Sequence, residues 1–356
     1  MNESGKTIAG VINAKGNTLI EEIVARQYEL QPELNERYGL KGRNLSIQDV
    51  RFTLSYLSQA LDLSSPSLFT DYVAWLKILL TGLGIPEKYI TVNFMCIREI
   101  LEREVPAEAK ALLSRYISEA MDVIANPSTD IPAFIDDKLP LSLMATQYLN
   151  ALLRGERHIA SHLIMEAVKS NVSVKDIYLN VFQRSQYEVG RLWQTNKITV
   201  AQEHYCTAAT QLVMSQLYPY IFATEKRGYS LVATCVAGEL HEIGIRMVAD
   251  FFEIEGWDTF YYGANTPTSS VIQAIIERKA DALGISATMT FHIPFVEDLI
   301  QKVRSNDACK DVQILVGGYP FKIDRNLWKK VRADGSAESA EGAIETAEKI
   351  LKKIEE

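Results

Sequence analysis

A change in the spacing of apolar residues after position 229 is the feature of this sequence that most constrains its fold. Short apolar runs occur there, the first and last of them rich in β-branched residues, and helical patterns separate them. Strands that alternate with helices predict βαβ units and a parallel sheet. The expected strands are 230–237, 258–262, 281–286 and 312–316, and the expected helices are 245–255, 267–279, 293–305 and 341–354.

The earlier part of the chain shows only the three- and four-residue spacing of amphipathic helices. Residues 1–130 and 138–225 are expected to form separate helical regions, because a segment with two prolines, 126–132, lies between them. Thr199, with Gln202 three residues later, fits a capping box. Helices are expected at 46–61, 68–83, 87–104 and 108–124, and then at 139–154, 157–171, 173–194 and 199–223. The second group, with its short connections, predicts a four-helix bundle.

Composition and charge limit the classes of partner. The chain of 356 residues has a formal net charge of −8 and shows no basic patch, so binding to nucleic acid is not expected. Its most apolar stretch, 72–85, contains Lys77 and is too short to span a bilayer, so no membrane partner is expected. The cysteines show no paired spacing and the N-terminus has no long apolar core, so we expect reduced thiols in a cytoplasmic protein.

The loop after the first expected strand, 238–244, carries the residues with the clearest chemistry. In open parallel sheets, ligands bind beyond the carboxyl ends of the strands, and this loop lies there. The imidazole of His241 suits a borderline metal such as cobalt, and Glu239 can hold its other ring nitrogen. Gly244 lets the backbone approach a bulky ligand closely. The other loops at this edge are 263–267, 286–294 and 317–320.

The loop and two later motifs resemble cobalamin-binding domains of the methionine-synthase type. Those domains carry Asp-x-His-x-x-Gly, then Ser-x-Leu after about forty residues, then Gly-Gly after just under thirty more. In this chain residues 245–285 separate the first motif from the second, and residues 289–316 separate the second from the third. The matching residues are Glu239, His241 and Gly244, then Ser286 and Thr288, then Gly317 and Gly318.

The resemblance implies a Rossmann-like domain in which His241 replaces the cofactor's own benzimidazole as lower axial ligand of cobalt. The displaced nucleotide tail would then pass Ser286 and the two glycines, where a side chain on either glycine would clash. Glu239 stands where the family usually has Asp, one methylene shorter, and Thr288 stands where it has Leu. The residues expected to contact the cofactor are Glu239, Leu240, His241, Glu242, Ile243, Gly244, Ser286, Thr288, Met289, Gly317, Gly318 and Tyr319.

The expected bundle resembles light-sensing adenosylcobalamin proteins, of which the MerR-type light-dependent repressors are the best known. Residues 194–202 separate Trp193 from Glu203 and His204, which matches their Trp-x9-Glu-His pattern. The resemblance implies that Trp193 packs on the adenosyl group and that the other two residues hydrogen-bond its hydroxyls and base. Some of those repressors carry a histidine directly after the tryptophan that binds cobalt from above. This chain has Gln194 there, so His204 or water would take the upper position.

Residues 1–130 do not resemble the DNA-binding winged helix of those repressors. They resemble, more weakly, the globin-like helical domain of photocobilins, which bind both cobalamin and a bilin. Cys96 could tether a bilin by a thioether, or it could be a buried free cysteine. His292 follows the third expected strand and could approach the cofactor or serve the structure of its loop.

These resemblances predict a light sensor that binds adenosylcobalamin, with biliverdin as a second chromophore in residues 1–130. Residues 138–225 would form a four-helix cap and residues 229–356 the cobalamin-binding domain. Loss of adenosyl in light would change cap packing, and a homo-oligomer or a separate output protein would read the change. We expect a binding protein rather than an enzyme.

The main alternative is a corrinoid methyl carrier for a separate methyltransferase, because such carriers share the bundle and the lower-face motif. Preference for methylcobalamin over adenosylcobalamin would favour the carrier. A bilin or haem sensor without cobalamin is a minor alternative.

Overall fold

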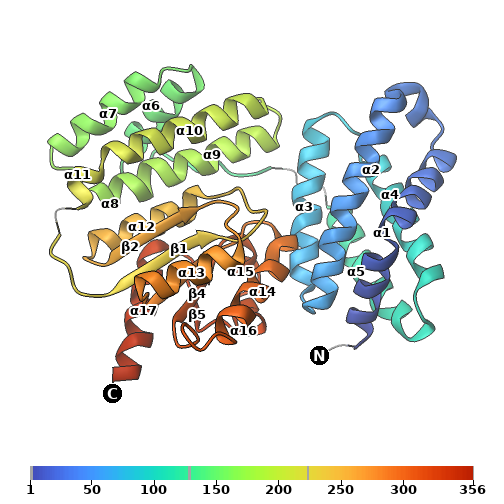
Figure 1. Ribbon diagram of the computed structural model, residues 1–356. Helices are drawn as coiled ribbons and strands as arrows, with labels where there is room; N and C mark the ends of the chain where they lie inside the picture. Colours follow the sequence, from blue (N-terminus) through green and yellow to red (C-terminus); the bar gives the residue numbers. More distant parts are fainter. Residues whose placement is uncertain (1–2, 127–129, 223, 356) are drawn as a thin grey trace. The chain divides into compact units, whose positions relative to one another are not determined.

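The computed structural model describes residues 3–126, 130–222 and 224–355 and divides into two compact units, Met1–Asp130 and Ile131–Glu356. Part of the expected linker at 126–132 therefore lies outside the described residues. The N-terminal unit is helical (Figure 1). Its helices are α1 (Glu3–Leu30), α2 (Glu33–Asp62), α3 (Pro66–Gly82), α4 (Glu87–Glu104) and α5 (Ala107–Ala125).

Helix α1 was not among the expected helices, yet it is central to the N-terminal unit and packs against α2, α4 and α5. Its buried residues include Ile8, Ile12 and Ile23. The expected helix 46–61 is the second part of α2, which bends at a non-helical residue, Gly39 (φ 57°). Cys96 is fully buried, and burial raises the pKa of its thiol to about 11, so this cysteine is a core residue rather than a reactive thiol.

The C-terminal unit begins with the expected bundle. Its helices are α6 (Ser142–Leu153), α7 (Arg157–Lys169), α8 (Val174–Ile177), α9 (Gln183–Gln194), α10 (Val200–Gln216) and α11 (Tyr218–Ile221), and a π-helical turn, η1 (Tyr178–Phe182), joins α8 to α9. The capping box at the start of α10 is confirmed: Thr199 accepts from the Gln202 amide, and the Gln202 side chain accepts from the Thr199 amide at 3.0 Å. The expected helix 199–223 breaks after Gln216, because Pro219 cannot donate to the preceding turn.

The rest of the C-terminal unit is a parallel sheet with strand order β2-β1-β3-β4-β5. The strands are β1 (Ser230–Cys235), β2 (Asp258–Gly263), β3 (Ala282–Ser286), β4 (Gln313–Gly317) and β5 (Gly335–Ser336). The helices are α12 (Ile243–Ile254), α13 (Thr268–Arg278), η2 (Thr290–His292, a 3-10 turn), α14 (Ile293–Arg304), α15 (Tyr319–Ile323), α16 (Leu327–Lys330) and α17 (Ala340–Glu355). The expected fold class, a helical N-terminal region, a helical bundle and a Rossmann-like parallel sheet, is confirmed.

The strand order places a topological switch point between β1 and β3. The chain leaves β1 toward β2 on one side and later returns to β3 on the other, so the loops after β1 and β3 diverge and leave a crevice, the usual ligand position in such sheets. Cys235, Ser286 and Gly317 are paired in register at the carboxyl ends of β1, β3 and β4. The three sequence motifs therefore lie along one edge of the sheet.

The bundle and the sheet share one hydrophobic core, centred on α12. Tyr178 and Phe251 pack with ring centroids 6.0 Å apart, and the Tyr178 hydroxyl donates to Asp250 Oδ2 at 2.7 Å. Trp257 packs edge-on against Phe252 with centroids 4.9 Å apart. In the described ranges, no helix combines the length and the apolar character needed to cross a bilayer.

Candidate functional site

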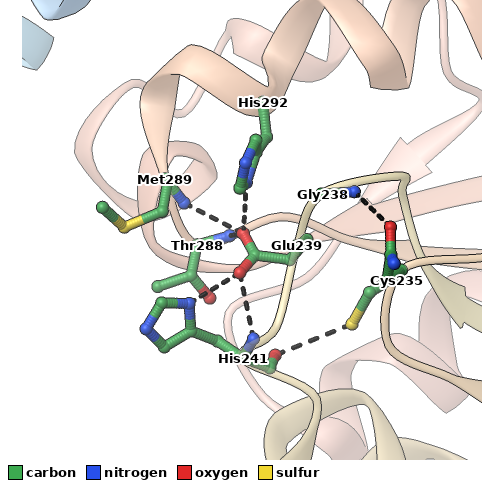
Figure 2. Close-up of polar contacts among 8 residues, drawn as sticks. Cys235, Gly238, Glu239, His241, Thr288, Met289 and His292 are labelled. Atoms are coloured by element: carbon green, nitrogen blue, oxygen red, sulfur yellow. Dashed lines mark hydrogen bonds and ion pairs between the residues drawn. The ribbon is translucent and has the colours of Figure 1, made fainter. Parts of the chain in front are cut away.

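A buried carboxylate at the switch point connects the loops after β1 and β3 (Figure 2). Glu239 is 0% exposed. Its Oε1 atom accepts hydrogen bonds from the His241 amide at 3.0 Å and from His241 Nδ1 at 2.6 Å. Its Oε2 atom faces the other loop and accepts from the Thr288 amide at 2.7 Å, the Met289 amide at 3.2 Å and His292 Nδ1 at 2.9 Å.

These contacts determine the charge of the site. Burial opposes ionisation of Glu239, but hydrogen bonds from His241, His292 and the backbone outweigh it and hold the pKa of the carboxyl well below its usual range. The pKa of His241 is raised, chiefly by its hydrogen bond to Glu239. Because an ionised carboxylate only accepts, both imidazoles donate from Nδ1.

One ring nitrogen of His241 is hydrogen-bonded to Glu239, and the other can serve as a metal ligand. Its side chain is 58% exposed, and since Nδ1 donates to Glu239, Nε2 is the nitrogen left for a metal. Leu240 is exposed beside it, and a Cβ added to Gly244 would meet nothing within 4 Å. The longer arm of Glu239 still reaches His241, so the departure from Asp does not break this pair.

Glu242 and Ile243, also expected at the cofactor, contact other parts of the protein. Glu242 accepts from Gln211 Nε2 of α10, from the Tyr261 hydroxyl and from the Ala264 amide, each at 2.9 Å. Ile243 begins α12 and packs against the shared core. Glu242 thus connects the loop after β1 to the bundle.

The two glycines at the end of β4, Gly317 and Gly318, differ in what surrounds them. A Cβ on Gly318 would lie 2.0 Å from the Ala287 carbonyl oxygen, and its φ of 106° disfavours any other residue. A Cβ on Gly317 would meet no atom closer than 3.6 Å, the oxygen of Ala337. A side chain at Gly318 would therefore clash with the protein itself, whereas space remains for a side chain at Gly317. Ser286 is buried at the end of β3, and Tyr319 is exposed at the start of α15.

The bundle residues of the Trp-x9-Glu-His pattern lie at one end of the α9–α10 pair. Trp193 is in the last turn of α9, and Glu203 is in the first turn of α10. Glu203 accepts from Thr207 Oγ1 at 3.0 Å and contacts Nδ1 of the exposed His204. The charge of Glu203 contributes to the raised pKa of His241, so this end of the bundle lies near His241.

His292 contributes more than the sequence indicated. It is buried, it contacts Glu239, and a Cβ on Gly238 would lie 3.3 Å from its Nε2 atom. Of its two expected roles, the structure shows the loop-building one. The strand order could have indicated the contact between His292 and Glu239, because a histidine after β3 and an acidic residue after β1 flank the same crevice.

Comparison with protein families identifies two matching regions. Residues 229–347 match a family described as "B12 binding domain", and residues 144–218 match a second family with the same description. The first region contains the sheet, and the second contains the helices from α6 to α10. Each match covers less than half of the chain.

The relatives of this chain include corrinoid proteins. A corrinoid protein of Desulfitobacterium hafniense is 26% identical over 211 residues, which is 57% of this chain and 95% of that protein. A dimethylamine corrinoid protein of Methanosarcina acetivorans is 26% identical over 193 residues, 52% of this chain and 88% of that protein. The monomethylamine corrinoid protein of Methanosarcina barkeri has a similar fold, with a TM-score of 0.51, 20% identity, and coverage of 60% of this chain and 99% of its own.

The relatives contradict the prediction of a light sensor of the repressor or photocobilin type. The names of the relatives describe corrinoid proteins, several of them for methylamines. The Trp-x9-Glu-His pattern is a weak indicator of a light sensor, because it consists of only three residues at the end of a helix pair. The relatives support the alternative, a corrinoid methyl carrier.

The geometry fits a cobalt corrinoid. One imidazole nitrogen of His241 is held by a buried carboxylate while the other is available, and Gly244 and Gly317 leave space where side chains would stand. Together with the two matched domains, these features show that the chain is a cobalamin-binding protein.

Proposed function

We propose that this chain is a corrinoid protein that carries a methyl group for a separate methyltransferase. The observation that carries the proposal is the pair formed by Glu239 and His241 at the switch point, within a region that matches corrinoid proteins over nearly their whole length. Such a pair supplies an imidazole whose basicity a carboxylate sets, which suits a metal ligand.

The proposal assigns His241 as lower axial ligand, with the tail lying along the ends of β3 and β4. The residues that would hold the cofactor from below are Leu240, His241, Gly244, Ser286, Thr288, Met289, Gly317, Gly318 and Tyr319. Bound cobalamin would supply a cobalt centre that accepts and gives up a methyl group. Glu239 holds a proton on Nδ1 of His241, so that Nε2 is the nitrogen that would bind the metal.

The bundle would cover the opposite face. Near the site its contacts with the sheet domain are polar: Gln211 donates to Glu242, and Arg246 donates to Ser215 at 2.7 Å and to the Tyr218 hydroxyl at 3.3 Å. Hydrogen bonds of this kind exchange with water at a net cost of about 1 kcal/mol each. These contacts lie toward the far end of α10 from Glu203 and His204, so we infer that the end with Trp193, Glu203 and His204 moves when a methyltransferase docks, while the shared core holds the rest of the bundle to the sheet.

We also propose a cytoplasmic location, because the four cysteines are unpaired and buried. Adenosylcobalamin, biliverdin and a homo-oligomer were predicted together with the light sensor. They are not part of this proposal, in which methylcobalamin is the form bound and a methyltransferase is the partner.

Binding preference tests the proposal. The apoprotein is titrated in the dark with methylcobalamin and, separately, with adenosylcobalamin, and visible absorption reports affinity and base-off, His-on coordination. We expect tighter binding of methylcobalamin. A methylcobalamin:thiol methyltransferase and a thiol should then remove the methyl group faster from the loaded protein than from free methylcobalamin.

His241→Ala is the variant that tests the axial role, and His204→Ala is its matched control in the bundle. The first should abolish the His-on spectrum, and the second should leave that spectrum intact. Tight binding of adenosylcobalamin with no binding of methylcobalamin would refute the carrier.

A further inference from the structure

We propose that residues 131–141 form a strap along α9 that holds the bundle end with Trp193 against the sheet, and that its release opens this end. The inference rests on the proposed function, since it concerns the regulation of access to the cofactor. The strap lies within the C-terminal unit, which begins at Ile131. It precedes both regions that match B12-binding families, which begin at residues 144 and 229, so it is not part of the matched domains.

Two sets of contacts fix the direction of the strap along α9. Near the end of the strap, the Pro140 carbonyl oxygen accepts from Arg184 Nη1, in the first turn of α9, at 3.2 Å. Near its start, the Phe134 amide donates to Glu188 Oε2 at 3.0 Å. The ring centroids of Phe134 and Tyr187 are 5.4 Å apart. The strap therefore runs opposite to α9, from the middle of that helix back to its first turn, and then enters α6.

The side chains that hold the start of the strap also hold the bundle end. Glu188 is 7% exposed and forms an ion pair with Arg191, which lies two residues before Trp193 in the last turns of α9. The Tyr187 hydroxyl accepts from Lys322 Nζ at 3.3 Å. Lys322 belongs to α15, the helix that follows the two glycines of the proposed tail site. Tyr187 and Glu188 thus connect the strap to the end of α9 and to the sheet domain.

The strap is attached by few buried groups. Phe134 is 39% exposed, and Ile135 and Leu141 pack only partly buried against the shared core. Leu141 has a φ of 53°, a left-handed conformation that a residue other than glycine keeps only where its surroundings hold it. Segments with few buried contacts open locally while the rest of the protein stays folded. The strap is therefore poised to detach from α9, and detachment would relieve the strain at Leu141.

The strap could instead serve only to complete the bundle fold, but its contacts argue against that role. The bundle core consists of fully buried side chains such as Tyr148, Phe182 and Val213. Phe134 lies outside that core, on Tyr187, which is itself 42% exposed and contacts the sheet domain. Loss of the strap should consequently change the position of α9 more than the stability of the core.

Hydrogen exchange of the full-length apoprotein, followed by mass spectrometry, tests the strap. Phe134→Ala removes the ring contact with Tyr187, and the control is Phe52→Ala, whose side chain is also 39% exposed but belongs to α2. We expect Phe134→Ala to speed exchange of amides 188–194 by about 2- to 10-fold, the change that loss of one aromatic pair produces. The amides of α7 and the control should not change. Unchanged exchange in α9, or equal acceleration throughout the bundle, would overturn the inference.

Methyl transfer from the loaded protein shows whether the strap controls access. Tyr187→Phe keeps the ring that packs on Phe134 and removes the hydroxyl that accepts from Lys322. Loaded with methylcobalamin, Phe134→Ala and Tyr187→Phe should each lose the methyl group to a methylcobalamin:thiol methyltransferase about 2- to 10-fold faster than the wild type and Phe52→Ala. Equal rates would overturn the inference. If the wild type does not bind methylcobalamin, the proposed function fails, while exchange in the apoprotein still decides whether the strap holds α9.

Discussion

Alanine substitutions at the adjacent glycines 317 and 318 should separate what the fold requires from what the cofactor requires. Gly318→Ala places a Cβ 2.0 Å from the Ala287 carbonyl oxygen, at a φ of 106°. Backbone strain of this kind costs about 1–3 kcal/mol, and forced overlap in a packed region costs a further 1–3 kcal/mol or so. We therefore expect the apoprotein to lose about 2–6 kcal/mol of stability, out of a typical total of roughly 5–15 kcal/mol.

Gly317→Ala should behave in the opposite way. Its Cβ would meet no atom closer than 3.6 Å, and glycine in a strand is unfavourable by about 0.5–1 kcal/mol relative to alanine. The apoprotein should therefore keep its stability within about 0.5 kcal/mol or gain slightly. Cobalamin affinity should fall, because the added methyl group occupies the space proposed for the tail.

Urea unfolding of the apoproteins and absorption titration with methylcobalamin are the two assays. For a unit of this size, a loss of about 2–6 kcal/mol corresponds to a fall in Tm of roughly 4–24 °C, which thermal unfolding can check. The reasoning is refuted if Gly317→Ala destabilises the apoprotein as much as Gly318→Ala does. It is also refuted if Gly317→Ala binds methylcobalamin as tightly as the wild type.

Three further predictions concern the apoprotein and are checked by urea unfolding. Burial raises the pKa of Asp250 to about 6, so this carboxyl destabilises the fold at pH 7, and the native state gains stability as pH falls through 6 toward the unfolded value near 3.8. Asp250→Asn should raise the free energy of unfolding by about 1–3 kcal/mol at pH 7 and leave it unchanged at pH 4. An equal effect at both pH values would contradict the raised pKa of Asp250. Thr199→Ala removes the capping box of α10 and should lower the free energy of unfolding by about 1 kcal/mol. The control is Thr268→Ala, at a helix start without a side-chain cap, which should lower it by less than half of that. Glu239→Gln should lower the free energy of unfolding by roughly 2–4 kcal/mol, because the glutamine NH2 group must face at least two N–H donors. A loss below about 1 kcal/mol would mean that the five N–H groups do not all donate to Glu239.

The alternation of strands and helices was predictable because each strand of the sheet, except β5, contains a short apolar run. β5 has two residues and leaves no such pattern. Helix α1 escaped prediction for another reason: Gly5, Gly10 and Gly16 lower its helix propensity, and tertiary packing compensates. At Gly5 the close approach is direct, since a Cβ there would lie 2.5 Å from the Leu61 carbonyl oxygen.

The position of the site was predictable and its hydrogen bonds were not. His241 and Glu239 are two residues apart, so their contact is local. The contact between Glu239 and His292 depends on two loops that meet only after the sheet has formed. The same limit applies to Glu242, whose partners come from α10 and from the end of β2.

The additional methylene of Glu239 has an evolutionary consequence. A carboxylate that serves both loops constrains two positions together, because a Glu buried between them needs donors from the second loop, while an Asp confined to its own loop does not. Among homologous domains, Glu at the position of residue 239 should therefore occur together with a side-chain donor at the position of residue 292. Domains with Asp there should vary freely at the second position, which a comparison of many sequences can count.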